Sequence, residues 1–154
     1  MSYSDELRST PIAAIVLGLG CTAPFLIVAF DQWTPFPFIS TELGLRVLTV
    51  LAAIVLSFAG GVRWGVALKY EPGNRQSTEL VASMLAALAG WSAVFLSQPI
   101  GLILLIAGFL LQALWDVLSV EQGRLPQWFG ALRMMLTVGV VLSLFSMLGK
   151  LIIS

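Results

Sequence analysis

The segment LRVLTVLAAIVLSFAGGVRWGVAL, residues 45–68, decides the fold class of this chain. It is apolar over a length that crosses a hydrocarbon core of about 30 Å, which takes about 20 helical residues. Lipid offers no partner for unpaired backbone groups, so such a segment crosses as a helix and not as an open sheet. Arg63 lies inside this segment with glycines on both sides. The sequence therefore predicts a membrane helix that carries a buried polar site.

The composition of the whole chain agrees with a membrane protein. Of its 154 residues, 58% are hydrophobic and 10% are charged, whereas soluble domains average about 45–50% and about 25%. A soluble chain this short could not bury so much apolar surface. The formal net charge of zero gives no reason to expect a nucleic-acid partner. With no histidine and only Cys21, we expect no disulfide framework, no metal site and no cofactor.

Five apolar stretches have the length of a membrane span. We expect one transmembrane domain over residues 1–154, with spans at about 11–30, 45–68, 80–96, 100–120 and 132–153. The first stretch is longer than the 7–15-residue core of a signal peptide, so we expect it to remain as a span. The predicted fold is an all-α, polytopic transmembrane helical bundle.

The connectors between the spans carry turn and interface residues. The turn EPGN at 71–74 precedes Ser77 and Thr78, either of which would cap the third helix. Pro99 suits a first helical turn, where its missing N–H costs nothing. In the connector DQWTPFPFIS, residues 31–40, we expect Trp33, Phe36 and Phe38 at headgroup level. We expect Asp31 to be solvated.

Lysine and arginine predict the orientation of the chain. One side of the membrane would carry Arg8, Lys69, Arg75, Arg124 and Arg133, and the other Arg46 and Lys150. Under the positive-inside rule the N-terminus is cytoplasmic.

Two charged residues, Arg63 and Asp116, lie inside the expected spans at similar depth. An unpaired charge there is costly, and a guanidinium matches a carboxylate, so we expect an Arg63–Asp116 ion pair. Gln112 lies one turn before Asp116 and would extend a polar network or bond a neighbouring helix. Trp64 would pack beside the arginine or lie against it as a cation–π partner. The alternatives to a structural ion pair are an Arg63 that reaches the headgroups, an anion pocket at Arg63, and a proton-carrying Asp116.

Small residues around Arg63 predict close helix packing. Ser57, Gly61 and Gly65 recur every four residues and form a smooth stripe that would admit a neighbouring helix. Gly60 belongs to the same candidate packing set. We therefore expect a bulky side chain at Gly61 to be poorly tolerated.

Three stretches, LSFAGGVRWGVAL, GFLLQALWD and LPQWFGALRMMLTVGVVLSL, carry a resemblance to a known family. The chain resembles, from Leu17 to Leu144, a family of small integral membrane proteins of unknown function that occurs in proteobacteria and has a mitochondrial transmembrane relative. The resemblance implies a multi-pass protein of the bacterial inner (cytoplasmic) membrane. The family pattern points to Gly60, Gly61, Arg63, Trp64, Gly65, Asp116, Leu125, Pro126, Trp128, Arg133 and Thr137.

Three kinds of function remain open at this point. The first is a non-enzymatic accessory or assembly factor that docks on a larger membrane complex, for which the distribution of the family suggests the respiratory membrane. The second is a lipid- or small-anion-binding protein or transporter component that uses Arg63 and Asp116. The third, an intramembrane enzyme, is disfavoured because the chain lacks histidine and a catalytic residue set. The expected partners are membrane lipids, a larger complex, or a second copy of the chain.

The predicted topology is testable with reporter fusions. A fusion after Glu71 should report a cytoplasmic location and one after Ser154 a periplasmic location, because the two points are separated by three spans. The same side at both points would contradict the count of five spans.

Overall fold

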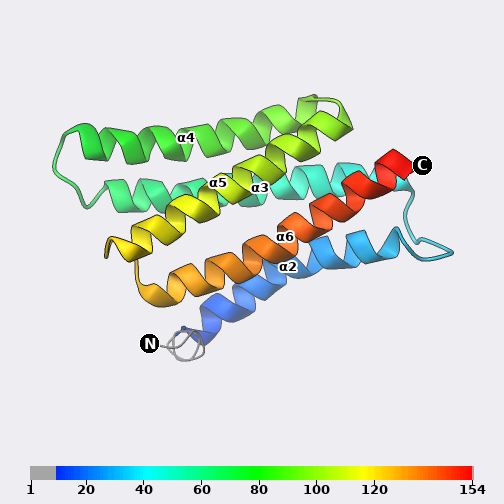
Figure 1. The fold of residues 1–154 in the computed structure, drawn as a ribbon, viewed down its shortest axis with the longest axis horizontal. Helices are drawn as coiled ribbons and strands as arrows, with labels where there is room; N and C mark the ends of the chain where they lie inside the picture. Colours follow the sequence, from blue (N-terminus) through cyan, green and yellow to red (C-terminus); the bar gives the residue numbers. More distant parts are fainter. Residues whose placement is uncertain (1–9, 154) are drawn as a thin grey trace. The chain divides into compact units, whose positions relative to one another are not determined.

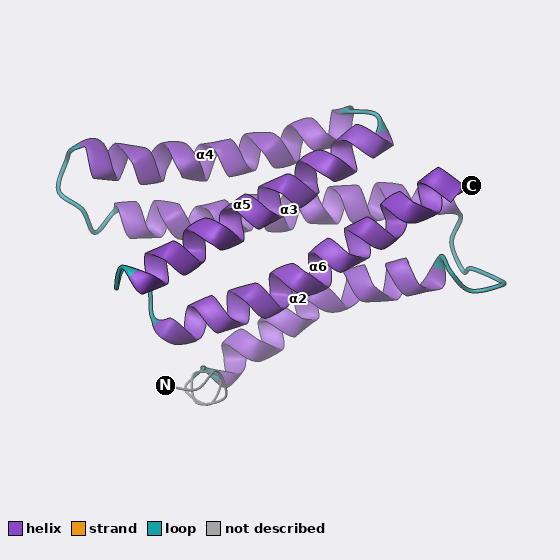
Figure 2. Cartoon of the chain, in the orientation of Figure 1, coloured by secondary structure: helices purple, strands orange, loops and turns teal. Residues whose placement is uncertain are grey.

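The computed structural model describes residues 10–153, and every regular element in that range is a helix (Figures 1 and 2). The helices are α2 (Ile12–Asp31), α3 (Thr41–Ala67), α4 (Asn74–Phe95), α5 (Gln98–Glu121) and α6 (Gln127–Ile153). Each is long and apolar enough to cross a membrane. The prediction of an all-α chain with five spans is therefore confirmed for the described residues. Arg8 lies outside them, and the orientation stays a prediction.

Helix α4 begins earlier than expected. The predicted span started at Leu80, but the helix starts at Asn74, after an N-cap at Gly73 that has no side-chain cap hydrogen bond. The hydroxyls of Ser77 and Thr78 donate to the carbonyls of Gly73 and Asn74, so the expectation that either caps the helix is wrong. The first turn of α4 is helical although its residues are polar. Glu79 therefore lies inside the helix.

The chain forms two compact units, and the expectation of a single domain stays a prediction. One unit comprises residues 45–112, and the other comprises residues 1–44 and 113–154. Helices α3 and α5 contribute residues to both units.

In the unit of residues 45–112, α3 and α4 approach each other through glycines. A Cβ at Gly60 would lie 2.8 Å from the Ser83 carbonyl oxygen, and one at Gly90 would lie 2.8 Å from that of Ala53. These distances are too short for any side chain, so the two backbones meet directly at both positions. Close contact of this kind holds α4 in a fixed register along α3.

The stripe of Ser57, Gly61 and Gly65 does not pack as expected. Nothing lies within 4 Å of a Cβ built on Gly61 or Gly65, and both glycines are exposed. The Ser57 hydroxyl donates to the carbonyl of Ala53 in its own helix. The packing prediction is thus wrong for the stripe within this chain and holds for Gly60. Successive residues of a helix differ by about 100°, and turning Gly60 and Arg63 inward turns Gly61 and Gly65 outward.

In the second unit, α2 packs along α6, and the two helices run in the same direction (Figure 1). Their contact also uses small residues, since a Cβ at Gly139 would lie 2.8 Å from the Thr22 methyl carbon. Gly123, with φ 68°, ends the last turn of α5. Its N–H donates to the Val120 carbonyl and the Arg124 N–H to that of Ser119, which is a Schellman motif. This turn leads directly into α6.

Leucine substitutions at the adjacent glycines of α3 test this packing. Gly60→Leu should lower the free energy of unfolding by about 1–3 kcal/mol or more, because the added side chain would clash with the backbone of α4 at Ser83. Gly61→Leu should leave it nearly unchanged, because the space there is open. Thermal unfolding in detergent measures both. Equal losses in the two variants would contradict the assignment of the buried face.

Candidate functional site: two buried ion pairs

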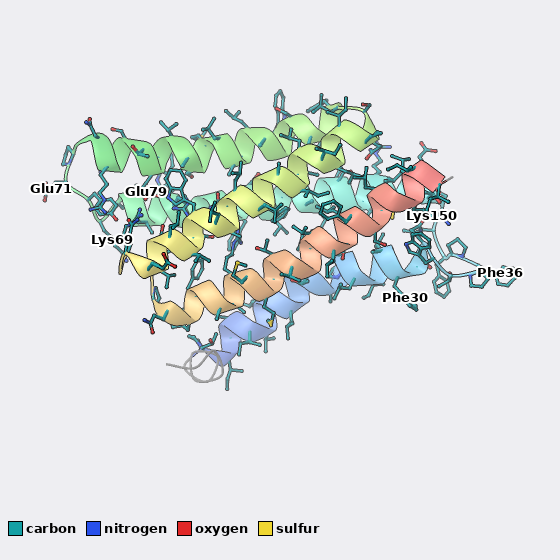
Figure 3. All side chains as sticks on the ribbon, in the orientation of Figure 1. Phe30, Phe36, Lys69, Glu71, Glu79 and Lys150 are labelled. Atoms are coloured by element: carbon teal, nitrogen blue, oxygen red, sulfur yellow. The ribbon has the colours of Figure 1, made fainter. Side chains whose placement is uncertain are left out.

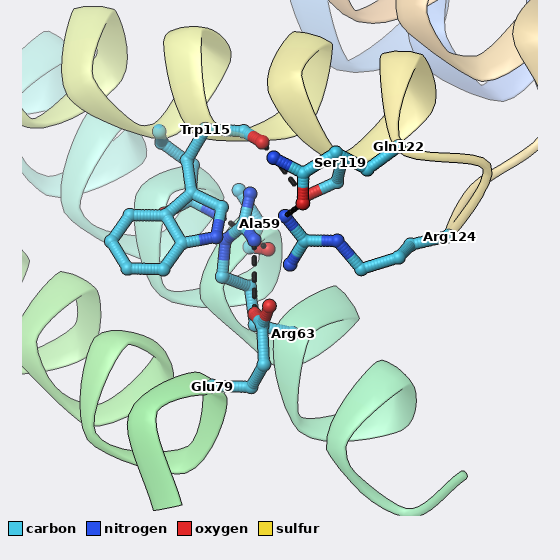
Figure 4. A network of polar contacts seen from close by, with 8 residues as sticks. Ala59, Arg63, Glu79, Trp115, Ser119, Gln122 and Arg124 are labelled. Atoms are coloured by element: carbon cyan, nitrogen blue, oxygen red, sulfur yellow. Dashed lines mark hydrogen bonds and ion pairs between the residues drawn. The ribbon is translucent and has the colours of Figure 1, made fainter. Parts of the chain in front are cut away.

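Arg63 is the largest fully buried side chain among the described residues, with 1% of its surface exposed. Its Nη1 lies 3.0 Å from Oε2 of Glu79 and donates a hydrogen bond to it (Figure 4). Glu79 is equally buried. A charged hydrogen bond of this length, shielded from water, is among the strong polar contacts of proteins. It joins α3 to α4.

The short connector between α3 and α4 places Arg63 and Glu79 at the same height along the two helices. Arg63 lies four residues before the end of α3, about 6 Å along the axis, and Glu79 lies five residues after the start of α4, about 7.5 Å. The Gln76 amide donates to the carbonyls of Ala67 and Tyr70 and so closes the end of α3. The antiparallel pair of helices therefore meets at matching depth.

Gln112 adds a third polar group to this unit. Its amide nitrogen donates to the backbone carbonyl of Ala59, 3.3 Å away, one turn before Arg63. The bond joins α5 to α3, which is one of the two roles expected for Gln112. Trp64, in contrast, lies on the exposed side of α3.

A second ion pair lies in the other unit. Nε of Arg133 in α6 is 2.9 Å from Oδ2 of Asp116 in α5, and Asp116 is 1% exposed. One turn of helix beyond Asp116, the Ser119 hydroxyl donates to the carbonyl of Trp115 (Figure 4). As in the first hairpin, a charge near the end of one helix meets the opposite charge near the start of the next.

These pairs bear on the predicted Arg63–Asp116 contact. Each of the two residues has an ionic partner in its own helical hairpin, Glu79 for Arg63 and Arg133 for Asp116. The Arg63–Asp116 pairing itself stays a prediction. Sequence reasoning missed Glu79 because it placed that residue outside the third span. The available signal was the face it shares with Ser83, Gly90 and Ala93, all of which are buried.

The remaining motif residues lie around the start of α6. Leu125 is half-buried in the connector, and the carbonyl of the exposed Pro126 accepts the N–H of Phe129. The rings of Trp128 and Phe129 meet edge to face with centroids 6.0 Å apart. Thr137 is buried one turn after Arg133. The motif thus marks the helix start that positions Arg133 against Asp116.

The chemistry of these clusters is that of paired charges. Residues 10–153 contain no group of three or more Cys, Asp or Glu side chains arranged to hold a metal ion. Each guanidinium faces a carboxylate, which cancels the charge that would otherwise oppose membrane insertion.

A double-mutant cycle tests the first pair. Arg63→Ala and Glu79→Ala should each cost about 3–5 kcal/mol, because each strands a buried charge. The double variant should cost less than the sum of the two, since neither charge is left alone. Thermal unfolding in detergent gives the three values, with Arg46→Ala, an exposed arginine of the same helix, as the mild control. Strict additivity would show that the two side chains do not interact.

Comparison with known proteins places the chain in a family. The family model described as "Protein of unknown function (DUF3429)" matches residues 10–149. Transmembrane protein 69 of Xenopus tropicalis is 32% identical over 155 aligned residues, which cover 95% of this chain and 56% of the relative. The chain thus spans little more than half the length of that curated relative. No solved structure matches it significantly. The expected resemblance to membrane proteins of unknown function with a transmembrane relative is confirmed, and the chain belongs to the DUF3429 family.

Proposed function

We propose that this multi-pass membrane protein is a non-enzymatic accessory or assembly factor that docks on a larger protein complex in the bacterial inner membrane. The observation that carries the proposal is the open glycine face of α3, formed by Ser57, Gly61 and Gly65. No atom lies within 4 Å of a Cβ on either glycine, although both lie within an apolar span.

The open glycine face has the properties of a helix-docking surface. Lipid tails gain little from a smooth backbone stripe, whereas a second helix gains close van der Waals contact along it. The exposed side chains of Phe58 and Trp64 border the face and would close around a partner helix. A partner helix in the membrane is therefore the occupant that fits this surface best.

The two ion pairs favour a structural role for the charges in the spans. A lipid phosphate or small anion at Arg63 would compete with the carboxylate of Glu79, which lies at 3.0 Å. A proton carrier at Asp116 would have to work beside the guanidinium of Arg133. Charges that are matched within the chain suit a protein that presents an apolar surface to its partner. This argument weighs against the alternative of a lipid- or anion-binding transporter component.

The cellular setting of the proposal comes from charge distribution and from the family resemblance. The lysine and arginine distribution favours a cytoplasmic N-terminus. A family shared by proteobacteria and mitochondria suggests a respiratory complex as the partner.

Native co-purification at endogenous level, followed by mass spectrometry of proteins and lipids, tests the proposal. The wild-type protein should retain a specific membrane complex, and Gly61→Leu should lose it while remaining folded. Leu85→Phe, which adds bulk on an exposed part of α4, should retain the complex and serves as the matched control. Retention of the same complex by Gly61→Leu would contradict docking through this face. A bound anionic lipid that depends on Arg63 would support the alternative instead.

A further inference from the structure

We propose that the connector between α2 and α3, residues 32–40, is a preorganised anchor that inserts Phe36 and Phe38 into the interfacial region of the bilayer. The two rings are 90% and 96% exposed, and Phe36 projects from the far end of the connector (Figure 3). Large apolar patches on a protein surface mark contacts with a membrane or with another protein. The contacts that hold the connector explain how they stay exposed.

Asp31 clamps the connector at its base. The residue is buried, so the expectation that it is solvated is wrong. Its Oδ1 accepts the N–H of Phe38 at 2.8 Å, and its Oδ2 accepts the N–H of Ile39 at 3.4 Å. The carboxylate thereby binds Phe38 and Ile39, near the C-terminal end of the connector, to the end of α2. It fixes the backbone on the C-terminal side of the exposed rings.

The side chains of Gln32 and Trp33 hold the N-terminal end of the connector in place. The Gln32 amide nitrogen donates to the Ile39 carbonyl and to Asp31, and a Cβ on Gly44 would come within 3.1 Å of that nitrogen. The Trp33 indole N–H donates to the Ser146 hydroxyl of α6 at 2.8 Å. The ammonium of Lys150 lies 5.4 Å from the Trp33 ring centroid, within cation–π range. The connector is thus tied to α2, α3 and α6.

Most backbone N–H groups of the connector are paired within the chain. Pro35 and Pro37 have no N–H. The N–H groups of Trp33 and Thr34 donate to the carbonyls of Phe30 and Asp31, and those of Phe38 and Ile39 donate to the Asp31 carboxylate. A backbone group that leaves water without a partner costs free energy. The internal partners therefore lower the free-energy cost of moving the connector from water into the interface.

The position of the connector identifies the bilayer as its partner. It joins the ends of two candidate spans, α2 and α3, so it lies where hydrocarbon gives way to headgroups. Phe30, in the last turn of α2, is 75% exposed and continues the apolar surface toward Phe36. Rigid presentation reduces the entropy lost on insertion. The connector would thus set the depth and tilt of α2.

Site-directed spin labelling in phosphatidylcholine vesicles tests the anchor. Phe36→Cys and Phe38→Cys are labelled separately in a Cys21→Ser background, because Cys21 is free and exposed. Both labels should collide freely with oxygen, which partitions into lipid, and should be shielded from a water-soluble nickel chelate. A label at Glu71→Cys, in the exposed α3–α4 connector, should show the opposite pattern. Nickel accessibility at 36 and 38 equal to that at 71 would overturn the proposal. Shielding from both reagents would also overturn it and would indicate a protein contact.

The role of Asp31 is tested in the same vesicles. Asp31→Ala should raise the nickel accessibility of the label at Phe36 several-fold, because the connector loses its clamp. Asp31→Asn should preserve the shielding, since the amide oxygen still accepts the Phe38 N–H. Unchanged nickel accessibility in Asp31→Ala would contradict the role of Asp31 as a clamp. Insertion of the rings is tested separately by the labels at positions 36 and 38 with Asp31 intact.

Discussion

An unpaired charge inside a membrane is costly, and this constraint organises both units of the protein. Arg63 with Glu79 and Asp116 with Arg133 each join two consecutive helices, close to the connector between them. The order of charge is reversed between the hairpins: the first helix carries the cation in one and the anion in the other. Each hairpin contains its own counter-charge. The two buried charges of a hairpin therefore neutralise each other inside the membrane. The glycine contacts between α3 and α4 and the outward face of α3 are consistent with that alignment.

The sequence was sufficient for the fold class. Apolar runs of span length, Pro99 in a first turn and the polar connectors predicted five membrane helices, and residues 10–153 contain them. Arg63, Asp116 and Gln112 were recognised as deep polar residues, and all three are buried. These features are local, since hydropathy and turn chemistry depend on few neighbours.

The misses have physical causes. Hydropathy marks the part of a helix that lies in lipid, so it ended the third span before Glu79 and hid the partner of Arg63. A rotation of about 100° per residue separates Gly60 from Gly61, and spacing alone cannot say which of the two faces inward. Asp31 looked solvated because its partners, the N–H groups of Phe38 and Ile39, are backbone atoms of a folded connector. Backbone hydrogen bonds of this kind leave no trace in residue type.

The most direct test of the paired hairpins is charge reversal. Arg63→Glu alone and Glu79→Arg alone place two like charges in a buried site and should prevent stable folding in detergent. The double reversal restores an opposite pair between α3 and α4 and should recover a cooperative thermal transition, as should the corresponding exchange of Asp116 and Arg133. We predict that each double reversal unfolds at a higher temperature than either of its single reversals. Double reversals that remain as unstable as the single ones would contradict the account.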